Sequence, residues 1–434
     1  MTIIKPFNGY RYDTRKTGKL SKVITPPYDV INPKQQEAYY RKHPENFIRL
    51  DLGKKYAKDD RDDNRYTRAA KALEEWISKG ILAKDREPSI YVYSQEYTIG
   101  GRRKARLGFI SLAKLEEDRT KGFLPHERTF KGPKLDRLNL MKETGANLSP
   151  IFSIVFDDNN KIMGILKRVS RSRKPAIDVA FEGTRNKVWR MTDPALIRKL
   201  EGLMSKKKAL IADGHHRYEV ALEYKVLSEA KGKAPQDCRS ALSEAKGYVM
   251  MYFATSDPKG LAILPTHRML EGVSAKDLLK NSGKLKEYFD IIKVYGRKGM
   301  LACMKRCGGH VIGVFLGGKD YLCLKLNRAD ASSLIRSENS SYWRNLDVVI
   351  LHQLVFDKVL GLKGEKAEKA ITFTRDPEVA FKWAAGRGKR ISFFLNPPSL
   401  KDIYNIVRCR ERMPHKTTYF FPKPPSGLVI NRLE

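Results

Sequence analysis

The sequence predicts a mixed α/β (α+β) protein built from two domains. Chains longer than about 250–300 residues usually divide into domains, and this one has 434 residues. Apolar runs typical of strands alternate with segments of helical periodicity, which favours a mixed architecture. The pattern changes near Gly272, so we predict an N-terminal domain of residues 1–271 and a C-terminal domain of residues 272–434.

The first elements of the N-terminal domain are a broken strand, a helix and a hairpin. Two consecutive prolines interrupt an apolar run, and Asp29 follows that break. Apolar residues at helical spacing predict an amphipathic helix over Tyr66–Ile81. Alternating segments on either side of a Gly-Gly pair then predict a β-hairpin with strands Ile90–Tyr97 and Arg103–Leu112.

A charged stretch follows the hairpin. Leu115–Phe130 has no clear period and is predicted to be a loop, and a helix is predicted around Leu138–Thr144. Alternating charge before a helix is usually solvated surface, yet a phosphate-handling loop needs the same residue types. The candidates in this stretch are His126, Glu127, Lys134, Asp136 and Arg137.

A strand, a helix, a second hairpin and another helix then lead to a polar junction. They are predicted over Ile151–Phe156, Ile162–Val169, Ile177–Phe181 with Lys187–Met191, and Pro194–Met204.

That junction is the segment Ile211–Glu219. Ala209–Ala212 is an apolar run typical of a buried strand, Asp213 and Gly214 interrupt it, and helical spacing follows. The unpaired N–H groups and the positive dipole end of a helix start attract phosphate. Glycine lets a ligand approach the backbone, and three donors come next: His215, His216 and Arg217. A surface cap with incidental histidines is the alternative, but donors at consecutive positions after an acidic cap favour a phosphate site.

The alternation continues beyond this junction. Strands are predicted over Gly247–Thr255 and Leu261–Leu270, and the second ends in a turn with His267 and Arg268. A lone histidine most often packs or caps, which is the alternative for His267. Later helices, a hairpin and a strand are predicted over Leu278–Phe289, His310–Leu316 with Tyr321–Leu326, Leu346–Leu360, Pro377–Ala385, Arg390–Leu395 and Leu400–Arg408.

The last segment, residues 413–433, is rich in proline, donors and aromatic residues. Its prolines exclude a helix, and its donors include Lys416, Thr417 and Lys423. Terminal segments fray unless they dock onto the body of a protein. We expect this one to fold back and approach the Asp213 turn.

The composition favours anionic partners. A formal charge of +35 attracts nucleotides, phosphorylated metabolites and nucleic acid alike. The basic residues are spread along the chain, so the charge reflects solubility or lineage as readily as nucleic-acid binding. No apolar run approaches the roughly 20 residues of a membrane span, and the start lacks a signal-peptide core. We therefore expect a cytoplasmic protein with no membrane partner; the sequence specifies no oligomeric state.

The segment IADGHHRYEVAL resembles the signature of a widespread prokaryotic family, the domain of unknown function 1015 family. The strand-DGHHR-helix element is also similar, more distantly, to the nucleotide-binding element of the ParB/sulfiredoxin superfamily. That superfamily includes CTP-binding partition proteins, sulfiredoxins and free-serine kinases. Further segments resemble the first family in order along nearly the whole chain: TPPYDVI (25–31), HPENFIRLDL (43–52), PHERT (125–129), KLDRLNLMKETGANLSPIF (134–152), LPTHRML (264–270) and MPHKTTYFFPKPPSGL (413–428).

The resemblance implies a ParB/sulfiredoxin-like nucleotide-binding core and a phosphotransferase that uses ATP or ADP, or CTP, with Mg²⁺. Its acceptor would be a small hydroxyl metabolite, free serine being the first to test. Phosphoryl transfer needs cationic donors, a metal on oxygen ligands and a base. The nucleotide would be held by Gly214, His215, His216, Arg217, Lys134 and Arg137, the metal by Asp213, and the substrate by His126, Asp136, His267, Arg268, Lys416 and Thr417. The catalytic candidates are Glu127, Asp29 and His216.

Two other classes stay open. A ParB-like nucleotide switch that binds DNA would use the positive charge, but no helix-turn-helix pattern follows the motif. A metal-dependent phosphohydrolase could use the adjacent histidines, but consecutive residues entering a helix point in different directions. The sequence contains no GxxxxGK[ST] P-loop, which excludes the commonest kinase scaffold.

Overall fold

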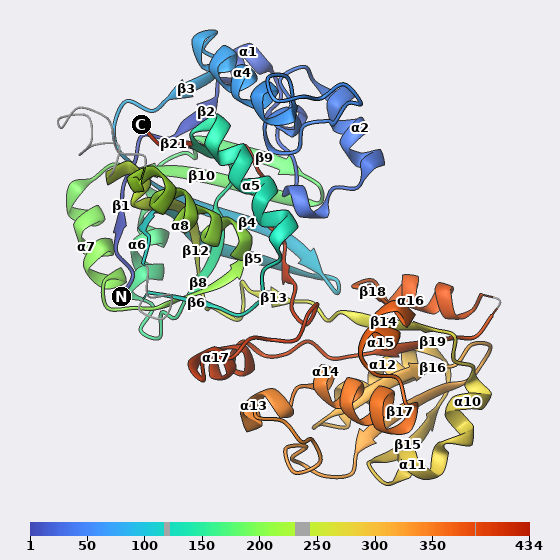
Figure 1. The fold of residues 1–434 in the computed structure, drawn as a ribbon. Helices are drawn as coiled ribbons and strands as arrows, with labels where there is room; N and C mark the ends of the chain where they lie inside the picture. Colours follow the sequence, from blue (N-terminus) through green and yellow to red (C-terminus); the bar gives the residue numbers. More distant parts are fainter. Residues whose placement is uncertain (117–121, 231–243, 387) are drawn as a thin grey trace. The chain divides into compact units, whose positions relative to one another are not determined.

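The computed structural model describes residues 1–116, 122–230, 244–386 and 388–434, and its secondary structure is mixed α/β as predicted (Figure 1). The chain divides into unit 1, residues 1–262 with 422–434, and unit 2, residues 263–421. Unit 2 therefore starts before the boundary predicted at residue 272, because the strand His267–Glu271 pairs with two strands of the second sheet. The last residues belong to unit 1.

A large mixed sheet forms the centre of unit 1. Its strand order is β6-β11-β8-β12-β5-β4-β10-β9, and β1 also pairs with β5. The pairs β6–β11 and β8–β12 are parallel, whereas the other pairs are antiparallel. The strands span Ile4–Lys5 (β1), Ile90–Ile99 (β4), Arg102–Lys114 (β5), Phe123–Pro125 (β6), Ile151–Val155 (β8), Ile177–Phe181 (β9), Thr184–Met191 (β10), Ala209–Asp213 (β11) and Tyr248–Thr255 (β12).

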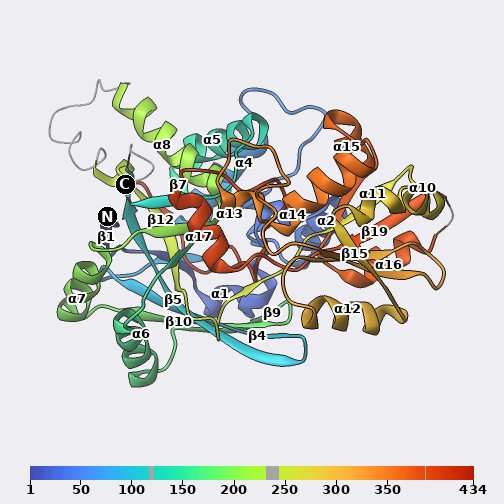
Figure 2. The same ribbon diagram turned by 90° about the horizontal axis from the view of Figure 1, so that it is seen from below.

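Helices cover both faces of this sheet. Figure 2 shows α5 and α8 on one face and α6 and α7 on the opposite face. Asn64 starts α4 with a reciprocal capping box, and Asp193 caps α7. Apolar residues of α5, α6, α7 and α8 pack with the strands into one core, which fixes where α8 begins. The helices span Arg65–Ser78 (α4), Lys131–Thr144 (α5), Lys161–Ser172 (α6), Pro194–Met204 (α7) and His215–Ala230 (α8).

The stretch predicted as a loop over Leu115–Phe130 contains the short strand β6. Its residues pair with β11 in parallel register, with Ile211 opposite Pro125. Residues 117–121 lie outside the described residues. The pairing brings the PHERT segment to the same sheet edge as the Asp213 turn.

Short elements complete unit 1. The C-terminal segment crosses it as β21, which pairs with β7, and Figure 1 shows the C-terminus beside β21. The short elements are Tyr10–Tyr12 (β2), Thr14–Thr17 (α1), Leu20–Lys22 (η1), Tyr28–Val30 (η2), Pro33–Lys42 (α2), Ile48–Asp51 (α3), Leu82–Lys84 (β3), Ala146–Asn147 (β7) and Asn431–Arg432 (β21).

Unit 2 contains an antiparallel six-stranded sheet of order β15-β17-β16-β19-β14-β18. Apolar residues of α12 and α16 pack on it. The strands span Phe289–Val294 (β15), Val311–Phe315 (β16), Tyr321–Leu326 (β17), Arg390–Phe394 (β19), His267–Glu271 (β14) and Ile371–Thr374 (β18); Ala262–Ile263 (β13) and Phe420–Phe421 (β20) form a separate pair.

Two helical segments of unit 2 differ from the prediction. The helix expected over Leu278–Phe289 is two short helices, and Phe289 already starts β15. The helix expected over Leu346–Leu360 changes into a π-helix, η3. The helical segments span Ala275–Lys280 (α10), Ser282–Lys286 (α11), Gly296–Arg306 (α12), Ser341–Arg344 (α13), Asp347–Ile350 (α14), Leu351–Val359 (η3), Gly364–Ala370 (α15), Pro377–Ala384 (α16) and Leu400–Arg408 (α17).

In the described parts of the chain, no helix is both long enough and apolar enough to cross a bilayer.

The C-terminal segment should contribute strongly to the stability of unit 1. Ile430 is fully buried and exchanges two main-chain hydrogen bonds with Tyr10. Replacing it, Ile430→Ala, should lower the free energy of unfolding by about 2–4 kcal/mol, because deletion of buried methyl groups leaves a cavity. Ile3→Ala, at a side chain 42% exposed, is the matched control and should change stability little. Urea unfolding curves measure both, and equal losses would contradict the docking of the tail.

Candidate functional site

The turn between β11 and α8 is built around a glycine that no other residue can replace without strain. β11 ends at Asp213, and α8 begins at His215. Gly214 has a φ of 92°, in the region that favours glycine. A Cβ placed there would lie 2.9 Å from both Nε and Nη2 of Arg217. The guanidinium of Arg217 therefore packs against Gly214 and leaves no room for a side chain there.

Carboxylates and cations from three separate segments meet at this turn. Arg217 Nη2 lies 2.8 Å from Asp213 Oδ2, and Lys423 Nζ lies 2.5 Å from Asp213 Oδ1. Lys423 also forms an ion pair with Asp29 of η2. Arg217 donates two further hydrogen bonds, to Ser149 Oγ at 3.0 Å and to the Pro150 carbonyl at 2.6 Å.

The charges of this cluster stabilise one another. Burial on its own would raise the pKa of Asp213, but Lys423 and Arg217 outweigh it and hold that pKa below its ordinary value. Burial would lower the pKa of Lys423, but Asp213 and Asp29 outweigh it and raise it. Both groups are consequently ionised at neutral pH.

Two strands of the central sheet position Lys423. Gln95 Nε2 donates to the Lys423 carbonyl at 3.3 Å, and Arg106 donates to the carbonyl of Pro422. Arg106 is 1% exposed, donates to the Gln95 side chain as well, and lies 4.5 Å from the Phe152 ring centroid. Sequence reasoning missed Gln95 and Arg106. The available signal was a charged residue and an amide within two predicted strands.

The two adjacent histidines bind the backbone of the PHERT segment. Nε2 of His215 accepts the main-chain N–H of His126 at 3.2 Å, and Nε2 of His216 accepts that of Phe130 at 3.0 Å. Because each Nε2 accepts, the neutral ring of each carries its proton on Nδ1. Burial lowers the pKa of His216, which keeps it in that neutral form. The pair therefore fastens the segment to the start of α8.

Glu127 lies between the rings of His126 and His215. Its carboxylate oxygens lie 3.5 Å from His215 Nδ1 and 3.8 Å from His126 Nε2, and its side chain is 41% exposed. His126 is fully buried and donates through Nδ1 to the Ile211 carbonyl at 2.7 Å. Glu127 is thus held near the turn while remaining accessible to solvent.

The three candidate residues on α5 contact different parts of unit 1. Lys134 Nζ lies 3.2 Å from Glu219 Oε2 on α8. Arg137 pairs with buried Asp51 at 2.9 Å and stacks on Tyr28, and it shares a cavity of about 40 Å³ with Arg217. Asp136 contacts Arg65, Tyr66 and Arg137, so it joins α5 to α4 and does not touch the Asp213 cluster.

The remaining substrate candidates lie in unit 2. Nδ1 of His267 accepts the N–H of Leu395 at 3.3 Å. Arg268 donates to the Lys416 carbonyl at 3.1 Å, and Thr417 donates to the Pro414 carbonyl at 2.6 Å. These four residues, His267, Arg268, Lys416 and Thr417, belong to unit 2, whereas the Asp213 cluster belongs to unit 1.

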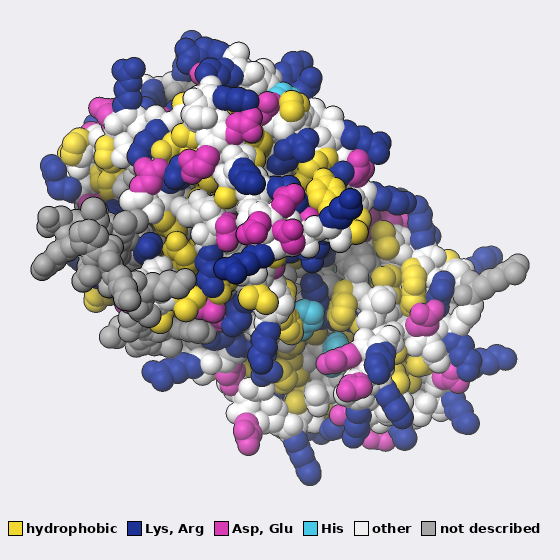
Figure 3. Space-filling view, turned by 45° about the horizontal axis from the view of Figure 1, so that its top comes forward, with side chains coloured by type: hydrophobic (Ala, Val, Ile, Leu, Met, Phe, Trp, Pro, Cys, Tyr) yellow, Lys and Arg dark blue, Asp and Glu magenta, His cyan; other side chains and the backbone are white. Residues whose placement is uncertain are grey.

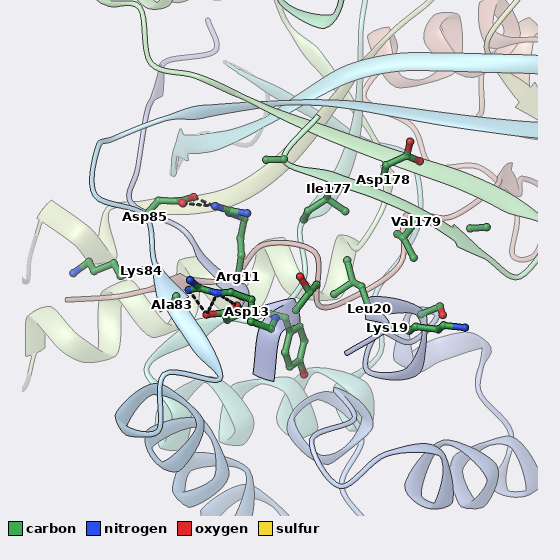
Figure 4. A pocket seen from close by; sticks show the side chains of 16 residues that line it. Arg11, Asp13, Lys19, Leu20, Ala83, Lys84, Asp85, Ile177, Asp178 and Val179 are labelled. Carbon is green, nitrogen blue, oxygen red and sulfur yellow. Dashed lines mark hydrogen bonds and ion pairs between the residues drawn. The ribbon is translucent and has the colours of Figure 1, made fainter. Parts of the chain in front are cut away.

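A larger cavity of about 660 Å³ in unit 1 holds none of the predicted site residues. It lies among β2, α1, β3 and β9, and Figure 4 shows Arg11 joined to Asp85 there. Most of its charged groups are paired: Arg11 with Asp85, Arg15 with Asp13, and Lys84 with Glu434. Over the face shown in Figure 3, Lys and Arg side chains are scattered among acidic ones rather than gathered in one patch.

The metal assigned to Asp213 does not fit the residues as placed. Both oxygens of Asp213 are engaged in ion pairs, one with Lys423 and one with Arg217. Among the described residues, no group of three or more His, Cys, Asp or Glu side chains could hold a metal ion. Magnesium usually binds one or two carboxylates together with substrate phosphates, so it would have to arrive with the nucleotide.

Removal of the central cation should destabilise the protein in a pH-dependent way. Lys423→Met leaves Asp213 poorly paired and should cost about 3 kcal/mol at pH 7, as breaking a buried ion pair does. The paired Asp213 has a lowered pKa, so its stabilising effect is complete above its ordinary pKa and is lost as the pH falls through the folded value. The deficit of the variant should therefore shrink only as the pH falls below about 4. Lys22→Met, at an exposed lysine of unit 1, is the control; denaturant unfolding across this pH range that shows a constant deficit would contradict the pairing.

The comparisons with known proteins identify the family. No curated protein matches the chain. A free serine kinase variant in complex with ADP is similar at 11% identity and a TM-score of 0.34, over 74% of this chain and 91% of that one. C-terminally truncated SbnI from Staphylococcus aureus has 12% identity and a TM-score of 0.34 over 74% and 85%. A conserved hypothetical protein from Pyrococcus furiosus has 11% identity and a TM-score of 0.32 over 75% and 95%. The family model described as protein of unknown function (DUF1015) matches residues 4–349, and the chain belongs to that family.

Proposed function

We propose that unit 1 binds a nucleotide by its phosphates at the Asp213–Arg217 turn and transfers a phosphoryl group to a small hydroxyl metabolite. One observation carries the proposal. Nε of Arg217 is buried and has no hydrogen-bond partner among the described residues, and it lies against Gly214 at the turn. Buried donors are almost always satisfied, so an oxyanion at this place would complete the site.

The surroundings of the Arg217 guanidinium suit a phosphate. The first N–H groups of α8 have no acceptor within the helix, and the helix dipole adds positive charge there. Lys423 of the C-terminal segment and Arg217 of α8 both pair with Asp213 at this turn, and Lys134 reaches Glu219 of α8. Developing charge on a transferring phosphoryl group would meet donors that are already in place.

The acceptor hydroxyl needs a base to take its proton, and two carboxylates lie near the turn. Asp29 and Glu127 are 39% and 41% exposed, which makes them accessible to a substrate. In the proposed step the hydroxyl oxygen bonds to the phosphorus, the P–O bond to the leaving nucleotide breaks, and the proton passes to one of these carboxylates. His216 acts as a donor through Nδ1–H, because its Nε2 accepts from the backbone. Free serine is the first acceptor to test.

The Arg217→Gln variant tests the proposal directly. It should weaken ATP or ADP binding about 10- to 100-fold, because a hydrogen bond to a charged group contributes roughly 1.5–3 kcal/mol. Turnover with free serine should fall further, since the lost donor stabilises charge that develops during transfer. Calorimetric titration with nucleotide and a coupled assay of serine phosphorylation measure the two effects, with the melting temperature recorded for each protein.

Lys19→Gln is the matched control. Lys19 is exposed and lines the 660 Å³ cavity, so this variant should bind nucleotide like the wild type. Loss of binding in Lys19→Gln and not in Arg217→Gln would instead place the nucleotide-binding site in the larger cavity. Tight duplex DNA binding that falls steeply with salt and ignores nucleotide would favour the DNA-binding alternative instead.

A further inference from the structure

Unit 2 buries a guanidinium that has no acidic partner in the described part of the chain. Arg268 of β14 is 1% exposed. It donates to the carbonyls of Thr266 and Lys416, and its Nε has no hydrogen-bond partner among the described residues. Within the described part of the chain it forms no ion pair with a carboxylate, and burial lowers its pKa to about 9. A buried charge without a counter-charge is costly, so it calls for an explanation.

At one other buried arginine the chain supplies that counter-charge. Arg137, which is comparably buried, has carboxylates on both sides, from Asp51 and Asp136. The pKa of Arg137 rises although burial acts to lower it, because those two carboxylates outweigh the burial. A buried arginine of this protein can therefore have acidic partners, as Arg137 does. Arg268 has none among the described residues.

A second unmatched group lies within the electrostatic reach of Arg268. Nε2 of His352 is buried and has no hydrogen-bond partner among the described residues, and its ring packs 5.0 Å from Phe356. Burial, helped by the charge of Arg268, lowers the pKa of His352 to about 4, so the ring is neutral. His352 belongs to η3, and π-helices are rare and frequently occur at functional sites.

We propose that Arg268 anchors an anion-binding site in unit 2 that takes the carboxylate or phosphate group of a small metabolite. An oxyanion supplies both the missing negative charge and an acceptor for Nε, and the planar guanidinium matches its geometry. The Phe373 ring, 5.4 Å from the guanidinium carbon, holds the group from one side. The site stands on residues of unit 2 alone and does not depend on nucleotide binding in unit 1.

Arg268→Met in the full chain separates an anion site from a structural arginine. Methionine is long and apolar, so in anion-free buffer the variant should be at least as stable as the parent protein, because an unpaired buried charge has been removed. Inorganic phosphate and succinate are the two probes, one for each oxyanion. We expect at least one of them to raise the melting temperature of the parent to a plateau, and the variant to lose that response at least tenfold in affinity.

The measurements are made in the Arg217→Gln background, in which phosphate binding in unit 1 is weakened. Arg328→Met, at an exposed arginine of unit 2, is the charge-matched control and should keep the anion response. A response to phosphate alone or to succinate alone identifies the ligand class. Titration calorimetry with the same two anions gives a second readout that does not depend on stability.

Two outcomes would overturn the proposal. In the first, neither anion binds the Arg217→Gln protein at millimolar concentration by calorimetry. In the second, Arg268→Met binds anion as the parent does. Should Arg268→Met fail to fold, Arg268→Lys keeps a charge without the fork, and unchanged anion affinity in that variant would equally contradict a guanidinium site.

Discussion

The site in unit 1 depends on one ammonium group held between two carboxylates. Lys423 joins Asp213, at the end of a central strand, to Asp29, on a short helical turn near the start of the chain. Without it, two carboxylates would face each other beside a buried arginine cluster, and like charges at such a distance repel. The ion pairs therefore fix the C-terminal segment, the η2 turn and the start of α8 as one arrangement, and the proposed phosphate binding in unit 1 presupposes it.

The two histidines of the DGHHR motif bind backbone N–H groups, although adjacent histidines first suggest a metal site. Each ring nitrogen Nε2 accepts a main-chain N–H of the PHERT segment. Glu127 is carried to the turn by those hydrogen bonds. The motif thus combines a backbone clamp, formed by His215 and His216, with a charge cluster, formed by Asp213 and Arg217.

The sequence predicted those parts of the fold and site that are local. The β11-turn-α8 junction and its glycine follow from patterns within a few residues, and the approach of the tail was expected from the proline-rich, donor-rich composition of the last segment. The partners of Arg137 and Asp136 did not follow, because the choice between Asp51, Arg65 and the turn is made by helix packing between α4 and α5. The π-helix η3 also has no sequence signal, since its apolar spacing is that of an ordinary helix.

The return of residues 422–434 to unit 1 has a consequence for biosynthesis. Unit 2 is contiguous in sequence, so all of its strands leave the ribosome before the segment that completes unit 1. Domains generally fold as units during synthesis, and a contiguous unit can do so early. Unit 1 cannot be completed until the last segment emerges, because that segment carries Lys423 and the buried residues around Ile430. Its charge cluster is therefore among the last features of the protein to form.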